Sequence, residues 1–400
     1  MNQTPTATQL RNDLVDHLLM QTVIPNPDVE HALRTVPREM FLPGIDLKDA
    51  YTDQAVTIKE NPNGPLALSC ASVPSVVAMM LAQLDVQPGD NILEIGAGTG
   101  YNAALLAELT GDLGKVTSID IDPDVTLHAR TMLNRTGYER VQVMERDGLI
   151  GAPENAPYDR MLAAVGLWDV PTAWWDQLRD GGRLVLPLRW RGQTRSVALT
   201  RRGDSLVSDN MQLCGFVPII GQDGERTAAL NEADTIRVHY DEDQAVDVDA
   251  LTASLSGTPS IEALSEQRIG GEESFDGVWL RATANDDRVC RLEATPNALE
   301  QDLIIRPAIP GRSPLLVDGG SLAYLIVRRE GADAQRPFRL GAAAYGPQAA
   351  DLAQDLITHI EAWGKARTAT PCLTITPAKT APATEGHVIS KPEGQLTLAY

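Results

Sequence analysis

The chain has 400 residues, which is enough for one large domain or for two of ordinary size. Its 54 acidic residues outnumber its 34 lysines and arginines, so the formal net charge is -20. A surface this acidic repels the phosphates of nucleic acids and of anionic lipids, so we expect neither a nucleic acid nor a membrane as a partner. A peptide or a small cation is easier for such a surface to accommodate.

The cysteines and histidines are scattered. The cysteines stand singly at positions 70, 214, 290 and 372, with no CxxC pair, and no HExxH motif occurs. This usage predicts a reducing compartment and no zinc site. Residues 1–25 have neither the basic nor the apolar region of a signal peptide, and no apolar run approaches the roughly 20 residues that span a bilayer. We therefore expect a soluble, cytoplasmic protein without a metal.

Two short helices are predicted at the start of the chain. Residues 10–21 place leucines on one helical face. In residues 26–36, Asn26 is suited to cap a helix and Pro27 to occupy its first position. Extended or turn-rich chain is expected over 40–56. We interpret residues 1–70 as N-terminal helices followed by a loop of the substrate cleft.

From about residue 71 helical and strand patterns alternate. Helices are predicted over 75–84, 102–109, after Asp122-Pro123 and over 173–178, and strands over 91–95, 115–120, 141–145, 159–165 and 182–188. This alternation predicts an α/β fold with a doubly wound, Rossmann-like parallel sheet. We assign it to residues 71–205.

Beyond residue 205 the helical and strand patterns no longer alternate regularly. The acidic stretch 240–260 is interpreted as a surface connection or a mobile helix. Strands are predicted over 278–284, 290–295 and 321–329, and an amphipathic helix within 346–366, whose apolar residues are Leu352, Leu356, Ile360 and Trp363. The last 30 residues, rich in Thr, Pro and Ala, are expected to form a flexible tail. We interpret residues 206–400 as an α+β extension that recognises a peptide.

A glycine cluster in LEIGAGTGY (93–101) marks a strand-to-helix turn. Its spacing is GxGxG, whereas the dinucleotide fingerprint is GxGxxG, and Glu94 precedes it. An acidic residue here would repel a pyrophosphate but suits an ammonium or sulfonium group. Asp120 ends the next strand, where a carboxylate can bind ribose hydroxyls. Adenosine joined to a cationic amino acid is S-adenosylmethionine (SAM), which we predict as the cofactor.

The predicted cofactor-binding residues are Glu94, Gly96, Ala97, Gly98, Gly100, Tyr101, Asp120, Ile121, Asp147 and Gly148. Two alternatives stay open. Glycines gather at any strand–helix turn, so the cluster alone would not identify a ligand. Asp147 is placed to accept from an adenine amine, yet an ordinary Asp-Gly turn explains the residue type equally well.

The chain resembles the protein-L-isoaspartate O-methyltransferases. The matching pieces, in the family's order, are VPREMFLP (36–43), DAYTD (49–53), SVP (72–74), LEIGAGTGYNAALLA (93–107), VTSIDID (116–122), RDGLIG (146–151), APYDRMLAAV (156–165) and QLRDGGRLVLPL (177–188). The resemblance covers half of the chain. It implies transfer of the SAM methyl group to a carboxylate of an aspartyl residue in a peptide, after which the ester is lost as a succinimide forms.

By the same resemblance, the serine before the proline positions the carboxylate, and it maps onto Ser72. A carboxylate is already a nucleophile at neutral pH, so orientation is the main requirement and no strong base is needed. The alternative for Ser72 is a helix cap. Substrate-binding residues are predicted to be Asp53, Ser69, Val73, Val165 and Trp168. Asp53 could equally cap a turn, and Trp168 could equally be a core residue.

The sequence departs from the family's usual pattern around Ser72. The loop NPNGPLALSCASVP (61–74) lacks the expected Gln, and AAVGLWD (163–169) replaces a run of small residues. With its long C-terminal extension and the segment CGFVP (214–218), the chain resembles extended actinobacterial methyltransferases that tailor ribosomally made peptides such as lanthipeptides. Our main hypothesis is therefore methylation of an Asp in a modified precursor peptide, giving aspartimide. General repair of isoaspartyl proteins, methylation of a small acid and a non-catalytic SAM-binding scaffold are the alternatives.

Overall fold

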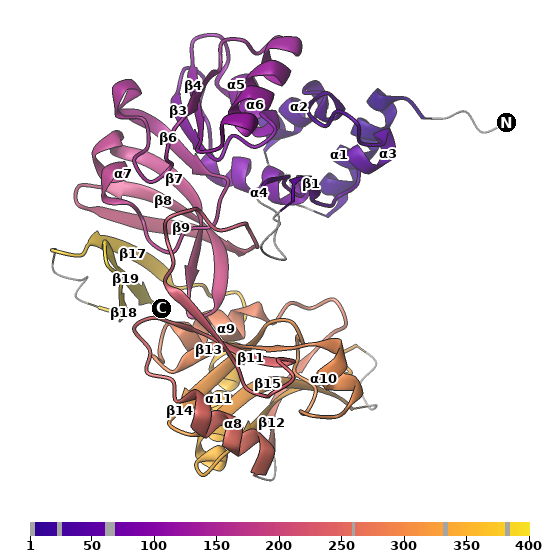
Figure 1. Ribbon diagram of the computed structural model, residues 1–400, viewed down its shortest axis with the longest axis vertical. Coiled ribbons are helices and arrows are strands. Elements are labelled where there is room, and N and C mark those ends of the chain that lie inside the picture. The colour runs from indigo at the N-terminus through magenta and orange to yellow at the C-terminus, as the bar shows by residue number, and fades with distance from the viewer. Residues whose placement is uncertain (1–4, 22–25, 61–68, 258–260, 331–334, 381–384) are drawn as a thin grey trace. The chain divides into compact units, whose positions relative to one another are not determined.

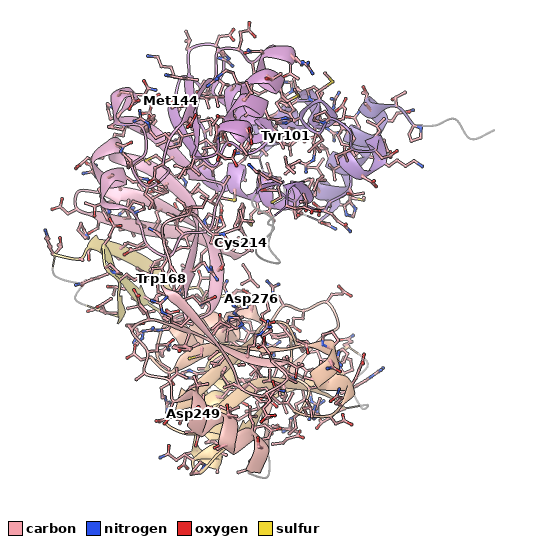
Figure 2. The ribbon with its side chains drawn as sticks, in the orientation of Figure 1. Tyr101, Met144, Trp168, Cys214, Asp249 and Asp276 are labelled. Atoms are coloured by element: carbon pink, nitrogen blue, oxygen red, sulfur yellow. The ribbon has the colours of Figure 1, made fainter. Side chains whose placement is uncertain are left out.

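The computed structural model describes residues 5–21, 26–60, 69–257, 261–330, 335–380 and 385–400. The chain forms two compact units (Figure 1). Unit 1 comprises Met1–Leu188 and Thr194–Gln222, and unit 2 comprises Arg189–Gln193 and Asp223–Tyr400. Each is filled with packed side chains (Figure 2). Among the described residues, no helix has the length and apolar character needed to cross a membrane.

Unit 1 begins with the two predicted helices, α1 (Ala7–Met20) and α2 (Pro27–Thr35). Asn26 caps α2 as expected, because its Oδ1 accepts from the amide of Asp28 at 2.8 Å. The stretch expected to be turn-rich contains the 3₁₀ helix η1 (Arg38–Phe41) and the short α3 (Leu47–Ala50). An antiparallel pair follows, β1 (Val56–Lys59) and β2 (Ser69–Ala71). Most of the loop between them lies outside the described residues.

The predicted parallel sheet is present in unit 1. Its strands are β3 (Asn91–Ile95), β4 (Lys115–Asp120), β5 (Gln142–Glu145), β6 (Tyr158–Ala163), β7 (Leu178–Trp190), β8 (Gln193–Arg202) and β9 (Ser205–Leu213). They lie in the order β9-β8-β7-β6-β3-β4-β5. The pairs β3–β4, β3–β6, β4–β5 and β6–β7 are parallel, and β8–β9 is antiparallel. The strand order reverses between β3 and β6, and in doubly wound sheets ligands bind outside the carboxyl ends of the strands at such a point.

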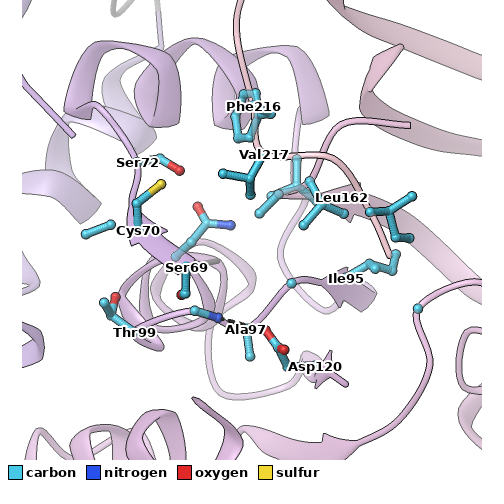
Figure 3. Close-up of a pocket in the computed structure, with 18 of the residues that line it drawn as sticks. Ser69, Cys70, Ser72, Ile95, Ala97, Thr99, Asp120, Leu162, Phe216 and Val217 are labelled. Atoms are coloured by element: carbon cyan, nitrogen blue, oxygen red, sulfur yellow. Dashed lines mark hydrogen bonds between the residues drawn. The ribbon is translucent and has the colours of Figure 1, made fainter. Parts of the chain in front are cut away.

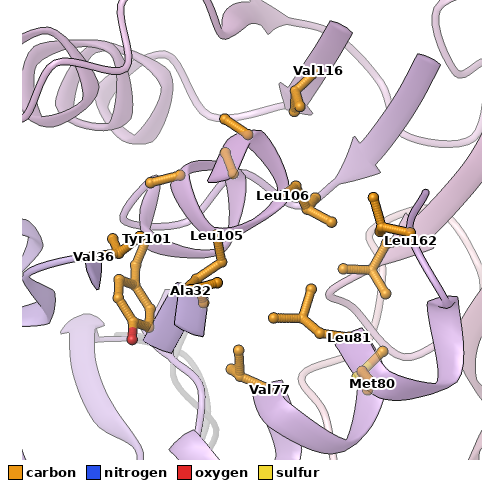
Figure 4. Packing of buried hydrophobic residues seen from close by; sticks show 14 of the residues in the cluster. Ala32, Val36, Val77, Met80, Leu81, Tyr101, Leu105, Leu106, Val116 and Leu162 are labelled. Carbon is orange, nitrogen blue, oxygen red and sulfur yellow. The ribbon is translucent and has the colours of Figure 1, made fainter. Parts of the chain in front are cut away.

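The helices of this sheet are α4 (Pro74–Leu84), α5 (Tyr101–Thr110), α6 (Pro123–Arg135) and α7 (Thr172–Gln177), with the 3₁₀ turn η2 (Pro153–Asn155). Leu81 of α4 and Leu105 of α5 are buried in a core that also contains Ala32 of α2 and Leu162 of β6 (Figure 4). Burying one leucine contributes about 1.5–3 kcal/mol. This core fixes the N-terminal helices and α4 beside the sheet.

Unit 2 contains a seven-stranded antiparallel sheet. Its order is β10 (Glu225–Ala229), β11 (Ile236–Asp241), β13 (Val289–Ala294), β14 (Ser313–Asp318), β15 (Ser321–Arg329), β16 (Phe338–Tyr345) and β12 (Ile261–Ile269). The helices are α8 (Val248–Gly257), α9 (Asp276–Thr283), α10 (Pro296–Glu300) and α11 (Ala349–Gly364). The apolar stripe predicted for α11 is confirmed, since its members are buried against the sheet. The acidic stretch 240–260 contains α8.

Two predictions for this half are wrong. Residues 278–284, predicted as a strand, lie largely in α9, where Val278 and Ala282 are buried one helical turn apart. A short apolar run does not distinguish a buried strand from a helix. The expected flexible tail instead forms β17 (Cys372–Pro377), β18 (His387–Ser390) and β19 (Gly394–Ala399), an antiparallel set. The Thr-, Pro- and Ala-rich composition of these residues obscured the strand pattern, in which the side chains of Leu396 and Leu398 are buried.

The boundary between the units also differs from the one expected at 205/206. That position falls at the start of β9, and unit 1 continues to Gln222. Residues 214–222 thus belong with the parallel sheet of unit 1, whereas the tip of the β7–β8 connection, Arg189–Gln193, belongs to unit 2.

Candidate functional site

A pocket lies in unit 1 at the carboxyl ends of β3 and β4 (Figure 3). Three segments surround it: the β2–α4 segment, the glycine turn after β3 and residues 216–220. It is lined by Arg38, Ser69, Cys70, Ala71, Ser72, Val77, Met80, Ile95, Gly96, Ala97, Gly98, Thr99, Tyr101, Asn102, Ile119, Asp120, Ile121, Asp147, Gly148, Leu162, Ala164, Val165, Phe216, Val217, Pro218, Ile219 and Ile220.

The glycine turn after β3 forms the floor of the pocket. Gly98 has φ +51°, and a Cβ built there would meet nothing closer than the carbonyl oxygen of Cys70 at 3.8 Å. The missing side chain therefore leaves space that a ligand can use. Gly100 has φ +85°, and its Cβ would lie 3.1 Å from the carbonyl oxygen of Ala129, so that glycine is required for packing against α6.

Asp120, the last residue of β4, faces this floor. Its Oδ2 accepts from the amide of Gly98 at 3.3 Å and its Oδ1 from the amide of Asp122 at 3.1 Å. Burial raises the pKa of the carboxyl group. Each oxygen keeps a further lone pair, so the carboxylate can accept from ligand hydroxyls. Ile121, next in the chain, lines the pocket with a partly exposed side chain.

Glu94 does not line the pocket. Its side chain is fully buried, and it accepts from Ser118 Oγ at 2.5 Å and from Asn102 Nδ2 at 2.7 Å. Burial raises its pKa to about 7. Asn102, which sequence reasoning missed, does line the pocket. Glu94 therefore orients Asn102 and lies behind the cavity wall.

Asp147 combines the two roles that the sequence left open. Its Oδ1 accepts from the amide of Leu149 at 2.9 Å, which is the side-chain bond of an Asp turn, and the residue also lines the pocket. A Cβ on Gly148 would lie 2.6 Å from Ile95 Cγ2, so that glycine is needed for close packing.

Ser72 lines the pocket immediately before α4 but does not cap the helix. The N-cap position of α4 is Val73, which makes no side-chain cap bond, and Pro74 is the first helical residue. The amide of Ser75, in the first turn of the helix, donates instead to Asp53 Oδ1 at 2.8 Å. Among the described residues, the Ser72 hydroxyl has no hydrogen-bond partner. The capping function thus lies with Asp53, and the Ser72 hydroxyl is available to a ligand.

Arg38 supports the same wall and was not predicted as a site residue. Its guanidinium is buried, with Nε donating to the carbonyl of Ala50 at 3.0 Å and Nη2 to the carbonyl of Ser72 at 3.0 Å. It lies over the Tyr101 ring, 5.1 Å from the centroid. Burial lowers the pKa of Arg38. The only sequence signal was its position in the VPRE motif after α2.

Residues 216–220 complete the pocket and were also missed as site residues. They are held by backbone bonds to the segment after β6: the amide of Gly166 donates to Val217 O at 2.7 Å, and that of Ile219 to Gly166 O at 2.8 Å. Phe216 and Val217 face the cavity in Figure 3. The sequence marked this stretch only through the CGFVP resemblance.

The pocket brings together most of the predicted site residues, namely Ser69, Ser72, Gly96, Ala97, Gly98, Tyr101, Asp120, Ile121, Asp147, Gly148 and Val165. It does not include Asp53, Val73, Glu94, Gly100 or Trp168. Trp168 is buried, and its backbone amide donates to Gln222 Oε1 at 2.8 Å. Of the two roles considered for it, the structure shows a core residue.

A doubly wound sheet with an open glycine turn after β3 and a half-buried carboxylate at the end of β4 is typical of a fold that binds a nucleoside-containing cofactor. The family profile described as protein-L-isoaspartate(D-aspartate) O-methyltransferase matches residues 9–224. The chain belongs to this family. It is accordingly a SAM-dependent methyltransferase, and S-adenosyl-L-methionine is its cofactor.

Relatives and solved structures bear the same family name. The protein-L-isoaspartate O-methyltransferase of Methanocella arvoryzae is 39% identical over 189 residues, which is 47% of this chain and 96% of the relative. That of Methanopyrus kandleri is 37% identical over 217 residues, 54% and 92%. A Plasmodium falciparum structure in complex with S-adenosyl-L-homocysteine (SAH) has 18% identity and a TM-score of 0.47, covering 53% of this chain and 99% of that one. Another solved protein-L-isoaspartate O-methyltransferase has 20% identity and a TM-score of 0.49, covering 91% and 96%.

Proposed function

We propose that this enzyme methylates the free α-carboxylate of isoaspartyl residues in peptides and proteins, the first step of their repair. The observation that carries the proposal is the Ser72 hydroxyl, which has no partner among the described residues and faces the pocket that also contains Asp120 (Figure 3). The names of the relatives in Methanocella arvoryzae and Methanopyrus kandleri support the choice of acceptor.

We assign the cofactor to the residues around the glycine turn. The open side of Gly98 leaves room for it, Asp120 would accept from the ribose hydroxyls, and Asp147 from the adenine amine. Ile121 offers an apolar surface to the adenine ring. When bound, SAM supplies a methyl group on a positively charged sulfur, and its transfer to a carboxylate leaves a neutral ester and a neutral thioether.

The residues of the opposite wall act on the acceptor. Ser72 donates a hydrogen bond to one carboxylate oxygen and thereby directs the other toward the methyl group. A carboxylate is ionised at neutral pH, so no side chain needs to remove a proton. Holding the two reacting groups in line is then the main source of acceleration. Ser69 and Val165 contribute to the walls that contact the peptide.

Tailoring of a ribosomally made peptide is the second candidate, with an Asp of a modified precursor as the acceptor. The wall formed by Ser69, Cys70, Ala71 and Ser72 favours it, because this stretch departs from the sequence usual in repair enzymes. Unit 2 also favours it, since the family profile ends at residue 224. We propose that unit 2 contributes to peptide recognition under either function. A cytoplasmic location, consistent with the scattered cysteines, is part of the proposal.

The test uses the full chain with SAM carrying a labelled methyl group. Three acceptors are compared: a linear peptide with one isoaspartyl residue, the same peptide with aspartate, and a cyclised peptide with aspartate. Repair predicts label on the isoaspartyl peptide only. Label confined to the cyclised peptide would favour tailoring, and absence of transfer to all three, with SAH binding intact by calorimetry, would overturn the proposed acceptor class.

A further inference from the structure

Arg38 is a buried cation without a counter-ion. Its side chain is 1% exposed, and it forms no ion pair with any residue that the structure describes. Two other buried arginines contrast with it. Arg160 pairs with Asp90 at 3.4 Å, and Arg191 pairs with Asp243 at 2.6 Å. A buried charge is costly unless it is paired, so the exception at the pocket requires a reason.

Some N–H groups of the Arg38 guanidinium bind backbone carbonyls, and others border the pocket. A guanidinium has five N–H groups, and Arg38 uses Nε on Ala50 O and Nη2 on Ser72 O. No described residue accepts from Nη1, and Arg38 lines the cavity. The carboxylate of Asp53 acts on the charge of Arg38, but it is engaged with the amide of Ser75. An unused donor edge of a buried cation therefore borders the pocket.

Ser72 lies beside this donor edge. Its carbonyl is bound by Arg38, while its hydroxyl has no partner in the described part of the chain, so one residue links the guanidinium to the position assigned to the acceptor. A guanidinium and a hydroxyl side by side match the two oxygens of a carboxylate.

We infer that Arg38 receives the acceptor carboxylate together with Ser72, and that it makes the site select for the ionised acid over its methylated product. The inference rests on the proposed function. The incoming carboxylate gives the buried cation its missing counter-ion. Methylation converts that anion to a neutral ester, and Arg38 is again unpaired. The product is consequently held more weakly than the substrate, which favours its release.

The experiment measures peptide binding by calorimetry in the presence of SAH. An isoaspartyl peptide is compared with the same peptide carrying an α-carboxamide in place of the α-carboxylate. We expect the wild type to prefer the acid by about a hundredfold, because the amide is uncharged and its NH2 group cannot accept from the second donor. Arg38→Met should reduce this preference at least about tenfold, while SAH affinity changes by less than about threefold.

Arg160→Met is the matched control, since it removes another buried arginine of unit 1 that does not line the pocket. It should leave the acid-to-amide preference unchanged even if it lowers stability. If Arg38→Met no longer binds SAH, Arg38→Lys is used in its place. A lysine cannot bind both carbonyls and also reach the pocket. The acid-to-amide preference of Arg38→Lys should therefore fall at least about threefold.

The outcomes separate the inference from the function beneath it. An Arg38 variant that binds SAH and loses acid and amide affinity equally would overturn the inference, since that result indicates a structural role alone. A wild type that fails to methylate the isoaspartyl peptide would instead remove the proposed function, and the inference with it.

Discussion

Ser72 differs from a capping serine because no residue that the structure describes binds its hydroxyl, and because Asp53 binds the helix amide. Ser72→Ala should therefore leave the folded state and the cofactor site intact. Methyl transfer should fall about tenfold to a hundredfold, which corresponds to the loss of one hydrogen bond to a charged group. Rates with an isoaspartyl peptide and SAH affinity by calorimetry would measure the two effects. Ser75→Ala is the control, because the side chain of Ser75 makes no hydrogen bond to any described residue, and the backbone amide that Asp53 binds is kept. Transfer by Ser72→Ala at the wild-type rate would refute the assignment.

Glu94 makes stability depend on pH. Its pKa is about 7 when folded, against 4.5 ordinarily, so between these values the folded state holds a proton that the unfolded state has released. Glu94 thus makes its full contribution to the free energy of unfolding below pH 4.5. This contribution falls by on the order of 3 kcal/mol as the pH rises toward 7. Glu94→Gln should flatten this part of the profile, as measured by urea unfolding from pH 4.5 to 8. An unchanged slope in Glu94→Gln would show that other groups cause it.

The site residues divide into those that local sequence could predict and those that it could not. Asp120 and Gly98 follow from a strand end and a glycine turn, whose positions the apolar strands define. Arg38 and Asn102 could not be predicted, because their roles depend on contacts with Ser72 and Glu94 that only the folded chain creates. The sequence shows that these residues are polar but gives no sign of their burial.

At the level of elements, α4 connects the pocket wall to the core. The helix begins at Pro74, and its first free amide is satisfied from outside by Asp53. Asp53→Ala should lower the free energy of unfolding by about 0.5–2 kcal/mol, the usual effect of losing a cap, whereas Asp53→Asn keeps the acceptor oxygen and should change it little. The KM for an isoaspartyl peptide should be nearly the same in both variants once folded. A rise in KM for Asp53→Ala without loss of stability would instead indicate that Asp53 contacts the substrate.

Elements were predictable wherever burial imposes a clear period. The strands β3 and β4 carry buried apolar residues between turn residues, Ile92, Leu93 and Ile95 in β3 and Val116 and Ile119 in β4, and they lie where expected. The same reasoning failed for α9, which is buried nearly all round, and for β17–β19, where the buried threonines Thr376 and Thr397 interrupt the apolar pattern. In both cases the segment was too short to show a clear periodic pattern. Its structure is decided by packing against residues that are distant in the sequence.

For the whole molecule, the net charge of -20 acts on every substrate that approaches. We expect an isoaspartyl peptide flanked by lysines to have a lower KM than the same peptide flanked by glutamates at about 0.01 M salt, where the Debye length is roughly 30 Å. The difference should shrink as salt is raised toward 1 M, where screening acts within about 3 Å. Because charges outside the pocket cause the effect, kcat should be similar for the two peptides.

Steady-state rates over this range of sodium chloride would measure the effect, with SAH affinity at each concentration as the control for the cofactor site. A preference for the lysine peptide that persists at 1 M salt would mean direct contacts within a Debye length, such as a carboxylate beside the bound peptide. A preference for the glutamate peptide at low salt would contradict the expectation, because the peptide would then be controlled by a local positive surface and not by the charge of the molecule.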